Sequence, residues 1–267
     1  MERFTLAIVL FVLGVGFLPA QEKEVPARTL RILAVGDSPP FRQEIRNGIR
    51  YELPPPEGSV PPIRVQAAIL DAEGAEQKSE YEIDNPKEPG LRLRLNNVTS
   101  RLTVPGAALS VTLLDDGTSW HQFQLPEGGD YLLVLFRDPQ LKSWGKARSI
   151  LVPDGGSSFG AGDMRFINVG PVNTAFTIGD RERFELAAGK VLFQTLGVSQ
   201  GTPAQVMYQD PKRGWQRFWS SALVQNRGER STIVVYFADG EKPRRPLKLI
   251  ALRERAVALS KERSTNP

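Results

Sequence analysis

The sequence of 267 residues contains no cysteine and only one histidine, His121. The absence of thiols excludes disulfides, cysteine nucleophiles and iron–sulfur or zinc-finger sites, and one imidazole is too few for a multi-histidine metal centre. We therefore expect no bound metal and no cofactor. Without disulfides the fold has to be stabilised by burial of apolar side chains, and hydrophobic residues make up 40% of the chain.

A strong excess of one charge sign is also missing. The chain has 34 Lys and Arg against 30 Asp and Glu, which gives a formal net charge of +4. Many basic residues alternate with apolar ones, as in Arg92–Leu95, and this alternation is typical of a strand with one solvated face. Because no basic cluster contains interleaved aromatic residues, nucleic acid is not an expected partner.

The N-terminal segment has the pattern of a secretory signal peptide. A charged start precedes an apolar run from Phe4 to Leu18, which ends at Pro19-Ala20. The run is shorter than the roughly twenty residues that a spanning helix needs. We predict a signal peptide over residues 1–20 and a flexible segment over 21–27, with the mature chain periplasmic or secreted and without a membrane span. Because Leu18 is not small, an uncleaved anchor is the alternative.

The rest of the chain reads as an all-β protein. Short runs rich in β-branched and aromatic residues are separated by turns such as Asp116-Gly117 and Ala188-Gly189. The predicted strands are 30–34, 91–95, 110–114, 131–136, 149–152, 165–169, 191–196, 205–208, 232–237 and 247–252. Only Leu252–Glu262 has a helical composition, so a short polar C-terminal helix or tail over 254–267 is predicted.

Two parts of the sequence resemble each other. Segments that match in the same order are Arg31–Gly36 with Arg165–Gly170, Arg50–Leu53 with Arg183–Leu186, Leu133–Asp138 with Val234–Asp239, and Ser149–Val152 with Lys248–Leu252. We interpret them as a tandem duplication of a β-sandwich module, residues 28–154 and 163–253. The alternative is that any two sandwiches share such alternation and turns.

The two predicted modules are joined by a glycine-rich connection over residues 155–162. Five of the ten residues from Pro153 to Gly162 are Gly or Pro, which predicts a flexible link. The first module is longer because of a polar, acidic stretch between Asp71 and Pro89, which is expected to lie on the surface.

Three sequence features invite a catalytic or metal-binding interpretation, and for each a structural role is favoured. Ser158 fits a G-x-S-x-G pattern, but it lies in the glycine-rich connection and the histidine precedes it. His121 has no orienting carboxylate beside it in a strand pattern. Asp115-Asp116-Gly117 lacks calcium-loop spacing and is typical of a hairpin turn. No catalytic residue is predicted.

The aromatic residues near the C-terminus suggest a contact surface. Strand alternation places Trp215, Arg217 and Trp219 on one face, where indoles and a guanidinium would stack on a sugar or on a partner's side chain. The alternative is that each sandwich buries one tryptophan in its core and another covers the seam between the modules.

The arginine-led strands Arg31–Gly36 and Arg165–Gly170 resemble tandem immunoglobulin-like β-sandwich modules of unknown function in exported bacterial proteins. The second part is the closer match, through Asn168-Val169-Gly170-Pro171, Phe176–Gly179 and Leu186–Gly189. The resemblance implies two sandwich modules and brings no catalytic residues. The Cys–Trp–Cys pattern of antibody domains is absent.

These observations lead to one expected function and two alternatives. We expect an exported, non-catalytic β-sandwich protein with a structural or protein-binding role, with a protein or polysaccharide partner at the cell envelope. The first alternative is a carbohydrate-binding module that uses exposed tryptophans. The second is a hydrolase that uses two carboxylates, because such chemistry needs no histidine.

Overall fold

The computed structural model describes residues 26–70, 76–77, 80–81, 90–106, 108–141, 143–180, 183–196, 201–239, 243 and 245–256. Its regular structure is almost entirely β, with a single 3₁₀ turn, η1 (Trp144–Lys146), which confirms the predicted all-β class. Within these ranges no helix has the length and apolarity needed to cross a bilayer. The predicted signal peptide, residues 1–20, lies outside the described residues.

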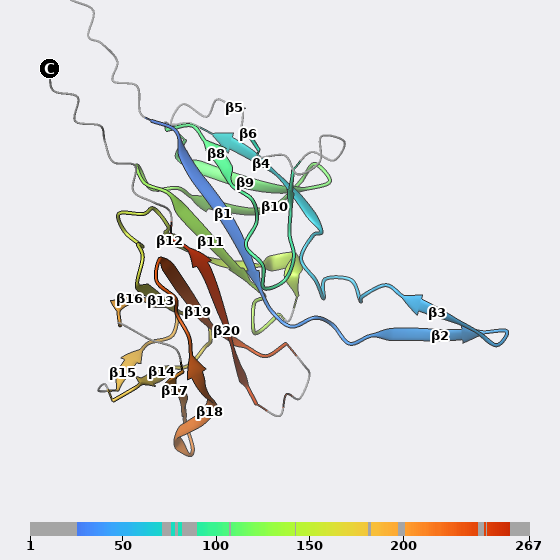
Figure 1. The fold of residues 1–267 in the computed structure, drawn as a ribbon. Helices are drawn as coiled ribbons and strands as arrows, with labels where there is room; N and C mark the ends of the chain where they lie inside the picture. Colours follow the sequence, from blue (N-terminus) through green and yellow to red (C-terminus); the bar gives the residue numbers. More distant parts are fainter. Residues whose placement is uncertain are drawn as a thin grey trace, which may run out of the picture.

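The N-terminal half forms two facing sheets (Figure 1). One has the order β12 (Arg148–Pro153), β11 (Tyr131–Phe136), β1 (Arg28–Val35), β8 (Leu102–Val104) and β6 (Glu80–Tyr81). The other has the order β10 (Thr118–Gln124), β9 (Ser110–Asp115), β4 (Arg64–Leu70) and β5 (Glu76–Gln77), with β7 (Leu91–Arg92) also paired to β4. Residues such as Ile32, Val111 and Leu133 fill the core between them.

The C-terminal half also forms two facing sheets. Their orders are β16 (Val191–Thr195), β13 (Asp163–Asn168), β19 (Glu229–Phe237), β20 (Leu247–Arg255), and β15 (Phe184–Leu186), β14 (Thr174–Ile178), β17 (Thr202–Asp210), β18 (Gly214–Leu223). Their core contains the aromatic cluster of Phe166, Phe176 and Phe184, whose ring centroids lie 5.0–5.3 Å apart.

The inner sheets of the two halves share one arrangement. In the first, β1 runs parallel to β11, and β12 continues antiparallel on the far side of β11. In the second, β13 runs parallel to β19, and β20 continues antiparallel. The matching sequences Arg31–Gly36 and Arg165–Gly170 therefore fall on equivalent strands and their ends.

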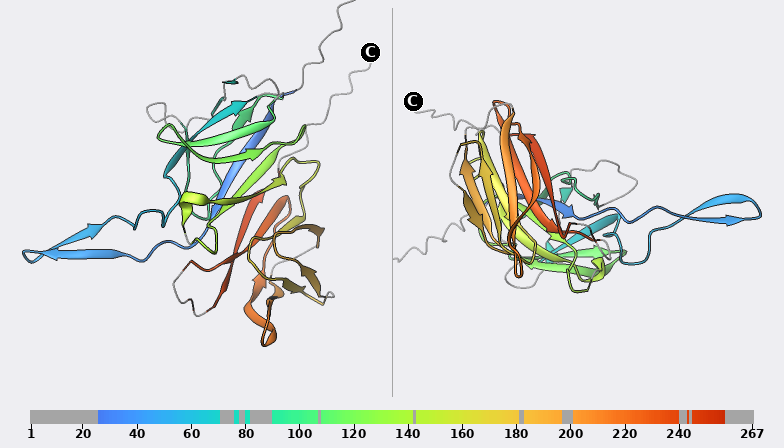
Figure 2. Two further views of the ribbon diagram at one scale, coloured as in Figure 1. Left: turned by 180° about the vertical axis from the view of Figure 1, so that it is seen from behind. Right: turned by 90° about the horizontal axis from the view of Figure 1, so that it is seen from below.

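A third apolar layer joins the two halves. It contains Leu33, Val35 and Val134 from the first inner sheet and Ile167 and Val234 from the second, all almost fully buried. Strand β1 is consequently buried on both faces, with Ile32 in one core and Leu33 in the other. Because the inner sheets pack face to face, the two halves form one body (Figure 2).

The connection over residues 155–162 is folded, although its composition predicts a flexible link. The Ser158 and Phe159 amides donate to the Gly155 carbonyl, and the Gly162 amide donates to Glu229. Phe159 is fully buried, so the glycines form a tight turn that brings this ring into the interior. Composition cannot show this because one buried aromatic side chain anchors the whole segment.

The C-terminal end of the described chain corrects another prediction. Strand β20 continues through Arg255 and pairs with β19 up to Glu229↔Arg255, so the predicted helix or tail is wrong for 254–255. The alternation of apolar and charged residues continues beyond Leu252. The extended strand also lets Glu254 pair with the buried guanidiniums of Arg31 and Arg230. The remainder of the predicted helix and tail, 257–267, lies outside the described residues.

A two-stranded hairpin projects away from the body (Figures 1 and 2). It consists of β2 (Arg42–Arg46) and β3 (Ile49–Leu53), which, within the described part of the chain, pair only with each other. The turn Asn47-Gly48 has φ values of 52° and 79°, the positive values of a type I′ turn, which suits the twist of a hairpin. The match of Arg50–Leu53 with Arg183–Leu186 is therefore not a structural equivalence, because Phe184–Leu186 forms β15 inside a sheet.

Candidate functional site

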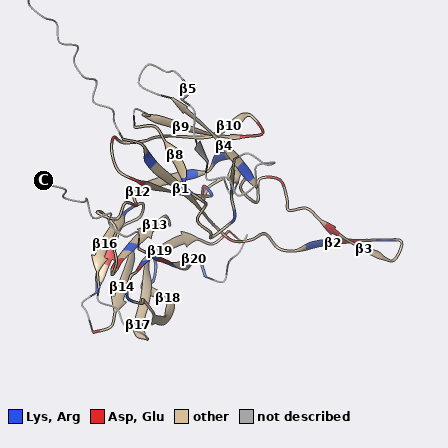
Figure 3. Ribbon diagram, turned by 45° about the horizontal axis from the view of Figure 1, so that its top comes forward, with Lys and Arg blue, Asp and Glu red and all other residues tan. Residues whose placement is uncertain are grey.

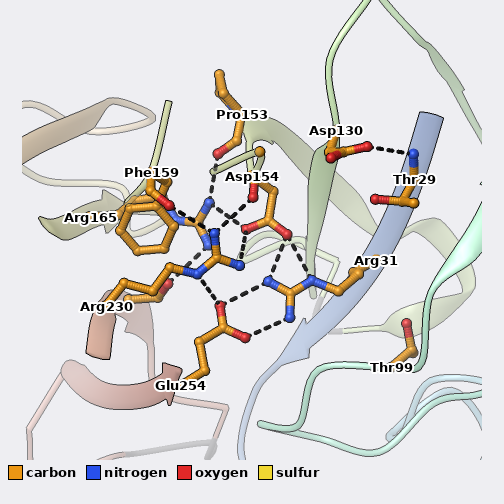
Figure 4. Close-up of polar contacts among 12 residues, drawn as sticks. Thr29, Arg31, Thr99, Asp130, Pro153, Asp154, Phe159, Arg165, Arg230 and Glu254 are labelled. Carbon is orange, nitrogen blue, oxygen red and sulfur yellow. Dashed lines mark hydrogen bonds and ion pairs between the residues drawn. The ribbon is translucent and has the colours of Figure 1, made fainter. Parts of the chain in front are cut away.

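The most densely charged part of the interior lies at one end of the seam between the halves (Figure 4). Asp154, directly after β12, is almost fully buried and accepts hydrogen bonds from both inner sheets. Arg31 Nε on β1 donates to its Oδ2 at 2.7 Å, and Arg165 Nη1 on β13 donates to its Oδ1 at 3.2 Å. Arg230 Nη1 on β19 donates to its backbone carbonyl at 2.8 Å.

Glu254 on β20 completes this ion network. Its two carboxylate oxygens accept from Arg31 at 2.6 and 2.8 Å, and Oε1 also accepts from Arg230 Nε at 3.0 Å. The ring of Phe159 lies against the other two guanidiniums, with its centroid 4.2 Å from Arg165 and 4.7 Å from Arg230. Three cations thus share two carboxylates and one aromatic face, and this network is called the seam network below.

Burial and the ion pairs of the seam network together shift the pKa values of its arginines. Burial opposes the charge of Arg31, but the hydrogen bonds and charges of Glu254 and Asp154 raise its pKa overall. Burial lowers the pKa of Arg165 to about 10, which leaves it charged at neutral pH. Each carboxylate oxygen of Asp154 and Glu254 accepts a hydrogen bond from a guanidinium.

Glu254 makes the stability of the protein sensitive to acid. Burial opposes its charge, but hydrogen bonds and charges from Arg31, Arg230 and Arg165 lower its pKa below the ordinary 4.5. A carboxyl group whose pKa is lower in the folded state than in the unfolded state stabilises the fold at any pH above its unfolded-state pKa. This stabilisation is lost as the pH falls through the folded-state pKa. We predict that the unfolding free energy falls as the pH drops below about 4.5 and that Glu254→Gln makes this fall less steep, as measured by urea titrations between about pH 3 and 7.

A clasp of two aspartates lies where strands β1 and β19 end. The Asp37 amide donates to Asp239 Oδ2 at 2.8 Å, and the Asp239 amide donates back to Asp37 Oδ2 at 3.1 Å. Asp37 also accepts from the Tyr236 hydroxyl at 2.9 Å and from Lys248 Nζ at 2.8 Å. Arg137 Nε pairs with Asp239 Oδ1 at 2.9 Å.

The two aspartates have pKa values displaced in opposite directions. Burial, together with the nearby charge of Asp37, raises the pKa of Asp239. Burial alone would raise the pKa of Asp37 too, but hydrogen bonds from Lys248, Tyr236 and the Asp239 amide lower it overall. Such a split is what a pair of catalytic carboxylates needs. In this structure each of the four carboxylate oxygens accepts a hydrogen bond from a neighbouring group of the chain.

A cleft of about 620 Å³ opens beside this clasp. Trp219, Phe218 and Tyr236 supply aromatic surface, and Asp37, Lys248 and Arg245 supply charges. Asp239 does not line this cleft, so only one of the two aspartates faces it.

The structure keeps Trp215 and Arg217 on one face of β18 but places Trp219 on the other. The pairing of β17 with β18 shifts between Val206 and Met207, so Phe218 is an extra residue on β18. The single-face prediction for Trp215, Arg217 and Trp219 is therefore wrong. Trp215, which precedes the bulge, has the guanidinium of Arg183 stacked over its ring, 3.9 Å from the ring centroid.

The bulge also decides which of these three residues lie at the surface. Trp219 pairs with the buried Val206 and packs against the C-terminal core, whereas Arg217 is exposed. A bulge places two successive residues opposite one on the partner strand, which breaks the alternation on which the prediction depends. Of the other two tryptophans, Trp144 is fully buried in the N-terminal core and Trp120 packs against that core.

The other predicted candidates occupy separate places. Ser158 Oγ donates to the Gly155 carbonyl in the connection. His121 Nε2 lies 2.9 Å from Ser149 Oγ, and burial lowers the pKa of the imidazole. Asp116 and Gly117 form the β9–β10 turn with positive φ. Across the described ranges no group of three or more His, Asp or Glu side chains is placed to hold a metal ion.

The projecting hairpin is the feature that sequence reasoning missed. It exposes large apolar side chains, with Phe41 69%, Ile45 62% and Ile49 58% exposed. Tyr51 is also exposed, and Arg46 stacks over its ring at 5.9 Å. Asn47-Gly48 between two alternating runs is the strongest short-range hairpin signal, and it would have identified the hairpin.

Comparison with known proteins gives no family. No family model matches the sequence, and no curated protein matches it. Among solved structures, a sugar-binding protein, pneumolysin, is similar over 60% of this chain and 31% of its own length, with 10% identity and a TM-score of 0.27. That TM-score is too low for the likeness to indicate a shared fold or function.

Proposed function

We propose that this chain is an exported, non-catalytic protein of two tandem immunoglobulin-like β-sandwich modules, residues 28–154 and 163–253, that binds a protein partner through its hairpin. The observation that carries the proposal is the hairpin itself, which exposes Phe41, Ile45, Ile49 and Tyr51 well away from the body. Clustered exposed apolar side chains mark interaction sites, because their hydration is unfavourable.

The composition of the hairpin favours a protein partner over a lipid surface. Half of its ten strand residues are charged, namely Arg42, Glu44, Arg46, Arg50 and Glu52. Figure 3 shows both signs in this region, with Lys and Arg otherwise scattered over the molecule. Charges of both signs beside apolar side chains suit a protein interface, whereas the apolar interior of a bilayer would leave them without partners.

The hairpin is attached to a body whose two halves are firmly joined. The third apolar layer, the seam network and the aspartate clasp fasten the two halves at several points along their interface. Strand β2 follows soon after β1, the strand that is buried on both faces. A rigid support reduces the entropy lost on binding, which supports a presenting role for the body.

The hairpin is tested by replacing residues 41–53 with a short Gly-Ser link. Because the hairpin pairs with no other strand of the described residues, we expect the melting temperature of the body to stay within a few degrees of wild type. A photo-crosslinking residue at position 49, on β3, should capture a protein in the producing cells. The matched control is the same group at exposed Arg217 on the body, which should capture none. Equal capture at both positions would contradict the proposal.

The cleft beside the clasp supports a second candidate, a carbohydrate-binding role. It combines the indole of Trp219 with Asp37, Lys248 and Arg245, the mixture of stacking and polar groups that a sugar ring requires. Titration with a panel of polysaccharides should then change the tryptophan fluorescence of the wild type but not of Trp219→Phe. An unchanged wild-type signal would remove this candidate.

A further inference from the structure

The free edge of β3 has a polar pattern set by the turn. Arg46 and Ile49 flank a two-residue turn and form a hydrogen-bonded pair, after which hydrogen-bonded and non-bonded pairs alternate. Ile49, Tyr51 and Leu53 therefore direct their backbone groups toward β2. Arg50 and Glu52 direct theirs to the open edge, where the described structure provides no partner strand.

These two outward residues limit how a second β3 can pair with this edge. An antiparallel, two-fold symmetric pairing has to match outward residues with outward residues, which leaves three registers. Two of them place Arg50 against Arg50 or Glu52 against Glu52, and like charges directly opposite are destabilising. The third places Arg50 against Glu52 of the second copy, twice, and so pairs opposite charges at both positions.

The same register matches the apolar side chains on the other face. It sets Tyr51 opposite Tyr51 of the second copy and Ile49 opposite Leu53, so every apolar residue of β3 meets another apolar residue. Aromatic and aliphatic cross-strand pairs stabilise sheets, as opposite charges do. The sequence Ile-Arg-Tyr-Glu-Leu is therefore complementary to itself when it is read in the antiparallel direction.

We propose that two copies of this chain associate through β3, forming a four-stranded sheet in the order β2, β3, β3, β2. A lone two-stranded hairpin is marginally stable in water, and three or more strands with an apolar face are needed for independent stability. A two-fold pair is the commonest way for identical chains to close an interface. This inference rests on the proposed function of the hairpin and names its partner.

Charge reversal tests the register. Arg50→Glu and Glu52→Arg each place like charges opposite, and each should weaken self-association about tenfold in sedimentation experiments on the purified full chain. Mixing the two single variants should restore a dimer, because every facing pair is then Glu with Arg. The double variant R50E/E52R should also dimerise. Single variants that associate as tightly as the wild type would overturn the register.

A cysteine scan tests which edge is used, since the natural chain has no cysteine. Tyr51 would face itself in a non-hydrogen-bonded pair with Cα atoms about 4.5 Å apart, within the range of a disulfide. Tyr51→Cys should form a disulfide-linked dimer rapidly under mild oxidation. Gln43→Cys and Ile45→Cys on the β2 edge are the matched controls and should react slowly. Faster linkage at position 43 or 45 would overturn the assignment to β3.

The failure of this inference is distinguishable from failure of the proposed function. Self-association would be overturned, and the binding role left in place, by three results together: the wild type is monomeric, Tyr51→Cys forms no disulfide-linked dimer, and position 49 still captures a different protein in cells. A monomer whose hairpin captures no protein would overturn both.

Discussion

Replacing Asp154 with alanine is expected to destabilise the protein by about 3–5 kcal/mol, because it leaves buried cations without their shared anion. Arg31 and Arg165 lose a carboxylate at 2.7 and 3.2 Å, and the Arg165 side chain is completely buried. Glu254 cannot compensate fully, since it already accepts from Arg31 and Arg230. Urea unfolding at neutral pH, followed by circular dichroism, measures the change.

Two controls separate the loss of charge from nonspecific effects of substitution. Asp115→Ala removes an exposed carboxylate at the end of β9, and its effect is expected to stay within about 0.5 kcal/mol. Asp154→Asn keeps an acceptor oxygen but removes the charge, so its effect should fall between the two. A loss below about 1 kcal/mol for Asp154→Ala would mean that the guanidiniums find other partners and that the seam network does not hold the halves together.

The strands were predictable because their signals are local. Alternation and β-branched composition indicated segments such as Tyr131–Phe136 and Thr232–Phe237, and the structure has strands at both. The match between Arg31–Gly36 and Arg165–Gly170 predicted corresponding strands, and both segments begin in strands of corresponding position; that each of these strands pairs in parallel with a later strand was not predicted. Such patterns depend on neighbours within a few residues, which the sequence displays directly.

The seam network was not predictable from the same patterns. Alternating arginines indicate a solvated strand face, and Arg92 and Arg94 are indeed exposed, yet Arg31 and Arg165 are buried. Their burial depends on Asp154 and on Glu254, which lies 223 positions from Arg31. The sequence did contain one signal of a specific role, because both matching segments have an arginine at the same position, Arg31 and Arg165. A solvated face needs only some polar residue there and would not require arginine in both.

The prediction that Trp215, Arg217 and Trp219 share one face was wrong for a different physical reason. One extra residue on β18 reverses the alternation at Phe218 and turns Trp219 toward the core, and no composition rule marks a bulge of this kind. The hairpin was missed because Arg50–Leu53 has the same alternating pattern as Arg183–Leu186. The Asn47-Gly48 turn, which pairs β3 locally with β2, distinguishes the two.

Phe159→Ala is expected to cost about 3–5 kcal/mol and to open the connection between the halves. The ring is fully buried, lies edge-on to Phe193 with centroids 5.9 Å apart, and covers the guanidiniums of Arg165 and Arg230. Its removal leaves a cavity beside two cations. It also removes the buried side chain that anchors the folded turn over residues 155–162. Limited proteolysis should then cleave within 155–162 much faster than in the wild type.

Phe159→Leu separates the two roles of the ring. Leucine restores most of the buried apolar volume but presents no aromatic face to the cations. The loss of unfolding free energy that exceeds the cost of repacking therefore measures the cation–π contribution, about 0.5–2 kcal/mol for each guanidinium. We expect Phe159→Leu to resist proteolysis nearly as well as the wild type while remaining less stable in urea. Equal stability of the leucine variant and the wild type would mean that Phe159 contributes only its buried volume. The three guanidiniums of the seam network would then be balanced by Asp154 and Glu254 alone, without help from the ring.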